Sequence, residues 1–199
     1  MKYSPLLDEL ISKLQYLPGV GRKTAQRMAF ALLGQDRSRG LDLACAITAA
    51  MSGIRRCSRC RNYSDEEICP ICASVKRQDE HVLCVVESPS DVAIIEQTGQ
   101  FKGTYFVLHG RISPLEGMGP EEIGMGQLEE LLRTGSFKEV IVALNSSVEG
   151  NMTSFMIARL AQRLGVTATT PSRGIPVGSE LDSMDEGTLT YSFSNRKNL

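Results

Sequence analysis

Two Cys-x-x-Cys pairs constrain the fold of this chain more than any other sequence feature. They form the pattern Cys57-x2-Cys60-x8-Cys69-x2-Cys72. Each pair presents two thiolates to one ion, and two pairs complete a closed tetrahedral site with Zn–S bonds of about 2.3 Å. Because four protein ligands leave no position for water, we expect one structural zinc ion per chain. Reduced or redox-active thiols are the alternative, and four thiolates also accept iron.

The two remaining cysteines are expected in the core, and the amino terminus indicates a reducing compartment. Cys45 and Cys84 fall in a predicted helix and a predicted strand, where we expect small core residues. Residues 1–5 lack the apolar stretch of a signal peptide, and no apolar run approaches the ~18 residues of a membrane span. We therefore expect a cytoplasmic protein, associated with no membrane and without a disulfide framework.

The first fifty residues are predicted to form a small helical unit. Ser4-Pro5 is a favourable helix start, and apolar residues then recur at helical spacing to residue 14. A second helix is expected between Gly21 and Gly34, and a third over about 39–52. The third helix is expected to turn four apolar side chains inward: Leu43, Ala44, Ile47 and Met51.

After the cysteines, short apolar runs alternate with helical patterns, as in a parallel α/β sheet. Strands are expected over four ranges: 82–86, 104–108, 140–144 and 166–169. Helices are expected over three ranges: 89–95, 128–132 and 153–164. Residues 110–126, with five glycines and two prolines, are expected to form a long loop.

The chain is thus predicted to be an α+β protein of four modules. They are a helical hairpin unit, a zinc finger, an α/β domain and a carboxyl-terminal tail or oligomerisation segment, with the bounds 1–54, 55–79, 80–172 and 173–199.

Positive and negative charges are distributed unevenly between the two ends of the chain. Residues 1–61 hold 11 Lys and Arg against 4 Asp and Glu, whereas residues 80–199 hold 9 against 15. The basic front is suited to a polyanion, and the acidic back to a basic protein or to solvent.

The segment between the first two helices carries a candidate nucleic-acid site. Gly19 and Gly21 permit positive φ and close backbone approach, and the following helix offers free N–H groups to a phosphate. Arg22, Lys23 and Arg27 add positive charge, and the last two share one helical face. This combination resembles the helix-hairpin-helix motif, which grips phosphates without reading sequence. A plain helical hairpin is the alternative.

Residues 85–91 are similar to the opening of a Toprim domain, the module of topoisomerases and primases. Those enzymes pair a glutamate such as Glu87 with an Asp-x-Asp after a later strand, and the carboxylates hold Mg²⁺. Here Asn145 and Ser147 stand at the aspartate positions, and Glu149 follows two residues on. We therefore expect the Toprim shape without its catalytic metal. Glu87 and Asp91 are instead candidates for contacts with a partner protein.

In this order, a helix-hairpin-helix, a four-cysteine zinc module and a Toprim domain resemble the RecR family of bacterial recombination mediators. Further segments similar to that family lie at 85–88, 103–119, 148–150 and 174–178. The resemblance implies a non-enzymatic protein that binds DNA independently of sequence and forms a ring or clamp. It also implies action with RecO and RecF to load recombinase at single-stranded gaps, at the nucleoid. Residues 151–154 and the tail 190–199 depart from the family pattern.

Several questions stay open at this point. The resemblance does not choose between a dimer and a tetramer. A metal-dependent Toprim nuclease or primase is the alternative function, disfavoured by Asn145 and Ser147. A zinc-stabilised adaptor that never touches DNA is a third.

Overall fold

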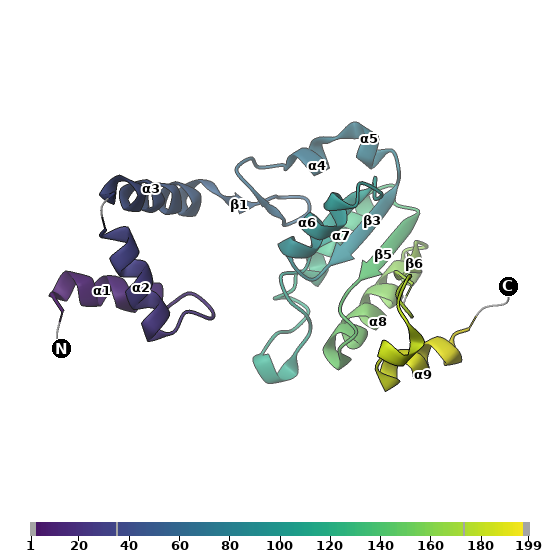
Figure 1. Ribbon diagram of the computed structural model, residues 1–199. Coiled ribbons are helices and arrows are strands. Elements are labelled where there is room, and N and C mark those ends of the chain that lie inside the picture. Colours follow the sequence, from purple (N-terminus) through teal and green to yellow (C-terminus); the bar gives the residue numbers. More distant parts are fainter. Residues whose placement is uncertain (1–2, 35, 173, 197–199) are drawn as a thin grey trace. The chain divides into compact units, whose positions relative to one another are not determined.

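The computed structural model describes residues 3–34, 36–172 and 174–196 (Figure 1). Our predictions for the first two residues and for the last three residues of the tail lie outside these ranges. The chain divides into two compact units, Met1–Ile54 and Arg55–Leu199, and each is described by itself.

The first unit is helical, as predicted. Its helices are α1 (Pro5–Leu14), α2 (Arg22–Leu32) and α3 (Arg37–Gly53). The Ser4 side chain caps α1 by accepting a hydrogen bond from the Leu7 amide at 3.4 Å. The contact between α1 and α2 buries Ile11, Ala25 and Ala29, and the two alanines allow the helices to approach closely.

The third helix does not bury the face that its apolar spacing predicts. Leu43, Ile47 and Met51 are 46%, 53% and 76% exposed, so the expected burial is wrong within this unit. Cys45, on the same helix, is also exposed rather than a core residue. None of the described residues of α3 is buried, although Gly40 near its start packs against the Leu32 carbonyl of α2.

The second unit begins with the cysteine segment, which we call the knuckle (residues 55–79). Strands β1 (Arg55–Arg56) and β2 (Tyr63–Ser64) pair antiparallel. The short helices α4 (Pro70–Ala73) and α5 (Val75–Gln78) follow. These two helices were not predicted, because single-turn helices carry too few residues to show a periodic pattern.

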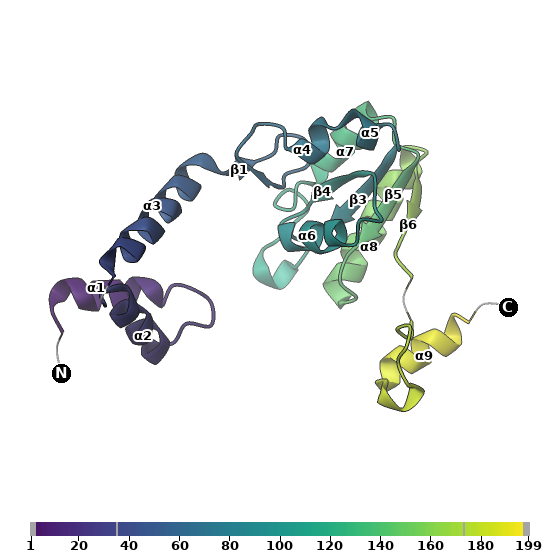
Figure 2. The same cartoon turned by 45° about the horizontal axis from the view of Figure 1, so that its top comes forward.

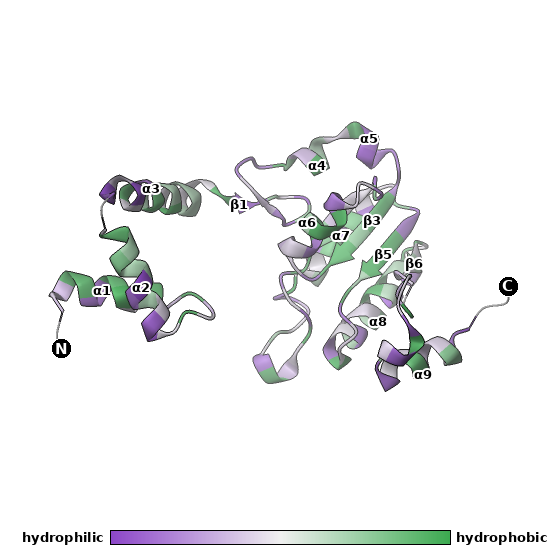
Figure 3. Ribbon diagram, viewed as in Figure 1, coloured by the Kyte–Doolittle hydropathy of each residue, from purple (hydrophilic) through white to green (hydrophobic). Residues whose placement is uncertain are grey.

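A four-stranded parallel sheet follows, and it confirms the predicted α/β fold. Its strands are β3 (Val82–Val86), β4 (Thr104–Val107), β5 (Glu139–Ala143) and β6 (Thr167–Thr169). The order is β4-β3-β5-β6, and each neighbouring pair is parallel. The ribbons of β3 and β5 are largely hydrophobic, as expected for central strands covered on both faces (Figure 3).

Helices cover both faces of this sheet (Figures 1 and 2). On one face, α6 (Pro89–Gln97) packs against Val86 and Tyr105. On the other face, α7 (Met125–Thr134) and α8 (Val148–Arg163) enclose the larger core around Phe106 and Val140. Cys84 is buried, as predicted.

Two helices begin three or more residues before their predicted starts. Helix α8 begins five residues before the predicted start at 153, because Ser147 caps it by accepting a hydrogen bond from the Gly150 amide at 3.0 Å. Helix α7 begins at Met125, after a loop that contains the 3-10 turn η1 (Pro114–Glu116).

The carboxyl-terminal segment forms the 3-10 turn η2 (Leu181–Ser183) and the helix α9 (Glu186–Ser194). The Asp185 side chain caps α9 by accepting a hydrogen bond from the Thr188 amide at 2.9 Å. Among the described residues, none of the helices combines the length and the hydropathy that crossing a bilayer requires.

Candidate functional sites

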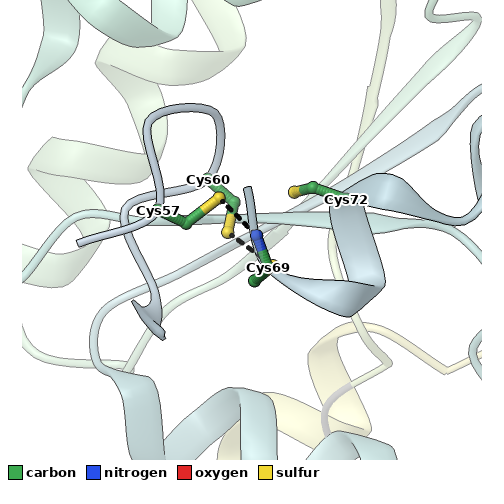
Figure 4. A group of neighbouring side chains, drawn as sticks. All are labelled: Cys57, Cys60, Cys69 and Cys72. Carbon is green, nitrogen blue, oxygen red and sulfur yellow. Dashed lines mark hydrogen bonds between the residues drawn. The ribbon is translucent and has the colours of Figure 1, made fainter. Parts of the chain in front are cut away.

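The four predicted metal ligands lie together in the knuckle (Figure 4). The sulfur atoms of Cys57, Cys60, Cys69 and Cys72 all lie within 4.8 Å of one another, and all four residues are buried. A tetrahedron with Zn–S bonds of about 2.3 Å has sulfur–sulfur edges of about 3.8 Å, so the cluster needs little adjustment to close on one ion. The arrangement fits one zinc ion, with no position left for a reacting water.

Without a metal, the pKa values of these neighbouring thiols shift in opposite directions. The hydrogen bond from Cys72 lowers the pKa of Cys60 to about 6, whereas burial raises the pKa of Cys69 to about 11. The same hydrogen bond raises the pKa of Cys72 well above its ordinary range. Four thiolates therefore exist together only when a cation compensates their charge, which couples metal binding to proton release.

The knuckle is attached to the sheet by main-chain and side-chain contacts. Strand β4 is an edge strand, and its Val107 amide donates a hydrogen bond of 2.8 Å to the Cys60 carbonyl. Ile71 of α4 packs against both the cysteine cluster and the sheet core near Tyr105. A folded knuckle thus covers part of an edge that would otherwise expose unpaired backbone groups.

Arg61 is the second anchor between the knuckle and the α/β domain. It is 7% exposed, and its guanidinium donates hydrogen bonds to the carbonyls of Ile123 and Glu122. It also lies over the Phe106 ring, 5.6 Å from the ring centre. Burial lowers the pKa of Arg61, and the charge of Arg56 adds to this effect.

A glycine makes room for this buried arginine. Gly124 has φ of +75°, and a Cβ added there would overlap the Arg61 guanidinium. Neither residue was predicted as structurally important, because they are 63 positions apart and only the folded chain brings them together.

The predicted nucleic-acid residues surround the turn between α1 and α2. Gly19 has φ of +77°, as its position in the turn requires, whereas Gly21 is extended at −78° and precedes α2. Apart from the chain neighbours of each glycine, no heavy atom of the described residues lies within 4 Å of a Cβ added at either position, which leaves space for a ligand at this turn. Arg22, Lys23 and Arg27 are all exposed.

The first turn of α2 retains the features that favour an anion. Gly21 provides no side-chain cap, and the first turn contains no acidic residue. Among the described residues, no carboxylate forms an ion pair with Arg22, Lys23 or Arg27. Free N–H groups, the positive end of the helix dipole and three unpaired cations therefore coincide at one exposed helix start.

The Toprim-like residues meet at the carboxyl ends of β3, β4 and β5. Glu87 follows β3, and both of its carboxylate oxygens have partners. Arg111 Nη1 lies 3.0 Å from Glu87 Oε1, and Asn145 Nδ2 donates to Glu87 Oε2 at 2.9 Å. The side chain of Glu87 is 14% exposed, and that of Arg111 is 36% exposed. Arg111 was not predicted, because it lies in a glycine-rich loop without a periodic pattern.

The remaining Toprim-like residues have hydrogen-bond partners of their own. Asp91 accepts hydrogen bonds from the amide and the hydroxyl of Ser88, at 2.7 and 2.9 Å, and thereby fixes the start of α6. Ser147 caps α8. Hydrogen bonds from the Glu149 amide and from the Ser147 hydroxyl lower the pKa of the half-buried Glu149 carboxyl. The described residues contain one cluster of metal-ligating side chains, and it is the four cysteines.

Comparison with known families accounts for most of the chain. Residues 7–51 match the RecR helix-hairpin-helix family, and residues 54–74 match the RecR zinc finger domain with four cysteines. Residues 81–170 match the Toprim domain, and residues 174–197 match RecR, C-terminal. The zinc prediction is thereby supported both by family and by geometry. These four matches, in this order along one chain, show that it belongs to the RecR family of recombination mediators.

Proposed function

We propose that this chain is a non-enzymatic mediator of recombinational DNA repair that works by assembly. In this proposal, several copies form a ring or clamp, bind DNA without reading its sequence, and act with RecO and RecF at single-stranded gaps. The non-enzymatic part of the proposal is supported by one observation. Arg111 donates a hydrogen bond to one carboxylate oxygen of Glu87, and Asn145 donates to the other. A guanidinium beside the carboxylate supplies the positive charge that Mg²⁺ supplies in catalytic Toprim domains.

The alternative, a metal-dependent nuclease or primase, needs several hard oxygen ligands around one cation. Asn145 and Ser147 offer neutral groups, and both already serve as partners within the chain. We expect neither plasmid nicking nor primer synthesis by purified protein with Mg²⁺ or Mn²⁺. Activity that disappears in Glu87→Gln would establish the enzymatic alternative, whereas activity that survives it would point to a contaminant.

DNA binding is assigned to the turn and the first helical turn of α2, with Gly19 and Gly21 shaping the backbone. The test is a salt titration of binding to single-stranded and duplex DNA. The double variant Lys23→Glu with Arg27→Glu should weaken binding to every sequence alike. Each lost phosphate contact should reduce the log–log salt slope by about 0.9 on duplex DNA and about 0.7 on single strands.

A charge-matched control separates this site from a general effect of net charge. Lys102 and Lys138 are exposed and lie in the second unit, and reversing both changes the net charge by the same amount. This control should keep the wild-type slope. Equal slopes in all three proteins would move the DNA site elsewhere, and no binding by wild-type protein would favour the adaptor alternative.

Self-association is supported by the exposed apolar face of α3. Leu43, Ile47 and Met51 are surface residues of the single chain, an unfavourable placement that contact with another copy would relieve. Assembly also multiplies phosphate contacts that are weak in one subunit. Ile47→Glu should lower the mass measured by light scattering and weaken DNA binding. The exposed Lys13→Glu on α1 is the control, and an unchanged mass in Ile47→Glu would exclude this face.

The acidic side of the Toprim domain is the proposed contact for a basic partner such as RecO. Replacement of Asp91 removes both a negative charge and the hydrogen bonds that fix the start of α6, so its two effects must be separated. Glu87→Lys and Asp91→Lys should each weaken the complex and leave DNA binding intact, whereas Asp91→Ser separates the loss of the cap from the reversal of charge. The proposal would be contradicted if Glu87→Lys and Asp91→Lys both bound RecO as tightly as the wild-type protein does.

We also propose that the protein is associated with the nucleoid, and a fluorescent fusion of the chain should then mark the nucleoid.

A further inference from the structure

Residues 107–112 lie between the knuckle and the Toprim glutamate, and we call them the bridging segment. The segment begins with the last residue of β4 and continues into the loop before η1. Two of its residues are bound to the knuckle. The Val107 amide donates a hydrogen bond of 2.8 Å to the Cys60 carbonyl, and Nε2 of His109 donates one of 2.6 Å to the Arg61 carbonyl. The knuckle therefore holds alternate residues of the bridging segment.

The intervening residues are bound to β3 and to the glutamate that follows it. The Leu108 amide donates to the Val86 carbonyl at 3.0 Å, and the Gly110 amide donates to the Glu87 carbonyl at 3.1 Å. Arg111 then places Nη1 3.0 Å from Oε1 of Glu87. One short segment thus carries the knuckle contacts and the Glu87 contacts in alternation, so that movement at the first set displaces the second.

The contact between His109 and Arg61 joins two residues in an uncommon backbone conformation. Both lie in the left-handed region, with φ of +59° at His109 and +63° at Arg61. Residues other than glycine keep such a conformation where surrounding contacts enforce it, and they concentrate at functional sites. The Tyr63 ring adds a further contact to His109, with ring centres 5.4 Å apart. The conformation of His109 therefore depends on a folded knuckle.

The knuckle side of this contact depends in turn on the metal ligands. The Arg61 amide donates to the Cys57 carbonyl at 2.9 Å, and the Cys57 amide donates to the Asn62 carbonyl at 2.8 Å. Cys57 and Cys60 are two of the four clustered ligands. The cysteines themselves form the buried cluster of the knuckle, with Ile71 packed against it. An ion that binds the thiolates therefore also fixes the turn that holds His109.

We propose that metal binding by the knuckle controls the charged surface at Glu87. With the metal bound, the knuckle holds His109, and the bridging segment keeps Arg111 on the Glu87 carboxylate. Loss of the metal frees residues 109–111, so the surface loses its fixed arrangement of charges. This inference concerns regulation of the surface assigned to a partner in the proposed function, and it rests on that assignment for what the surface binds. Its tests need no partner, so their failure would leave the assignment of Glu87 untouched.

The release should end at Ile112, because that residue is held from the other side. Its amide donates a hydrogen bond of 3.0 Å to the hydroxyl of Thr153 on α8, and Thr153 is 0% exposed. The first experiment compares amide hydrogen exchange by NMR in the zinc-loaded and chelator-treated full-length chain. Zinc removal should speed exchange of the Gly110 amide about tenfold or more and change that of the Ile112 amide by less than about twofold. Equal acceleration of both amides, or unchanged exchange at Gly110, would overturn the proposal.

A second experiment breaks the contact while the metal stays bound. In His109→Asn, asparagine tolerates the positive φ, and its side chain ends short of the position of Nε2. His81→Asn is the matched control, because His81 also has a positive φ, of +57°, but precedes β3. Elemental analysis should find one zinc per chain in both variants.

In zinc-loaded protein, His109→Asn should speed exchange of the Gly110 amide about fivefold or more, the value of one ordinary hydrogen bond. It should also shift the NMR signal of the Arg111 guanidinium toward that of the chelator-treated chain. His81→Asn should change neither signal. A wild-type Arg111 signal in His109→Asn, or the same change in both variants, would overturn the proposal.

Discussion

Arg111 and Glu87 form an ion pair of 3.0 Å at the carboxyl end of β3, with Asn145 on the second carboxylate oxygen. Together, Arg111 and Asn145 give both carboxylate oxygens of Glu87 a partner from within the chain. A divalent cation at this carboxylate would have to displace a guanidinium and would then find two neutral side chains at the neighbouring positions. In the function proposed above, the loss of the metal site therefore has two parts, the replaced aspartates and the added cation, and the second is not visible in the motif.

Reversing both parts should restore metal binding. The triple variant Arg111→Leu, Asn145→Asp, Ser147→Asp brings three carboxylates together without the competing cation, and it should bind Mn²⁺ at millimolar or lower concentration. Asp at 147 retains a favourable helix cap, so α8 should persist. The measurement is loss of the free Mn²⁺ signal in electron paramagnetic resonance. Wild-type protein and Arg111→Leu alone should bind more weakly, and tight binding by wild-type protein that Glu87→Gln abolishes would contradict this account.

Removal of one zinc ligand should unfold the knuckle locally. The knuckle has little apolar core besides the cysteines and Ile71, and structural zinc contributes ~10 kcal/mol or more of apparent binding free energy in modules of this kind. Cys57→Ser and Cys72→Ser should lose the single zinc ion and expose the knuckle to proteolysis. Elemental analysis and limited proteolysis measure both effects. Cys45→Ser, at an exposed cysteine outside the cluster, should keep one zinc per chain.

The features that the sequence predicted well are the local ones. Cysteine spacing, the apolar runs of β3 and β5, and the glycines of the first turn each report on a short segment, and the fold contains all of them. Helix α9 was missed, although Asp185 three residues before Thr188 is a recognisable cap signal. The start of α8 was missed because Ser147 was interpreted only as a replaced metal ligand.

The features that the sequence did not predict depend on tertiary contact. No local pattern distinguishes Arg61 from the other arginines of the knuckle, yet it is buried against Phe106 and the 122–123 backbone. Arg111 pairs with a residue 24 positions away. The apolar spacing of α3 predicted burial, but periodicity identifies a face and not the partner that covers it.

Replacement of Arg61 should separate the knuckle from the sheet. Arg61→Met retains the apolar contact with Phe106 and leaves the carbonyls of Glu122 and Ile123 without donors, which should cost about 2–3 kcal/mol of unfolding free energy. Arg61→Lys should fall between, because an ammonium lacks the forked geometry. Urea unfolding of the zinc-loaded protein measures the change. Arg56→Met, at an exposed position, should stay within about 0.5 kcal/mol of wild type, and an equal effect of both substitutions would refute the anchoring role.

His109 should make the stability of the second unit depend on pH. Its Nε2 lies 2.6 Å from the Arg61 carbonyl and therefore donates to it. Burial lowers the pKa of His109, and the positive charges of Arg56 and Arg61 act in the same direction. The folded pKa thus lies below the ordinary value of about 6.5, so the unfolded chain takes up a proton that the folded chain does not. Stability from this residue is present above pH 6.5 and is lost as pH falls through the folded pKa.

The test compares His109→Asn with wild-type protein between pH 7.5 and 5.5. Asparagine tolerates the φ of +59° at this position and does not titrate in this pH range. The unfolding free energy of the variant should fall less steeply with decreasing pH. Zinc must remain bound throughout, since protonation of the thiolates would destabilise both proteins alike, and metal content at each pH is the control. Parallel curves for the two proteins would assign the pH dependence to the cysteines and not to His109.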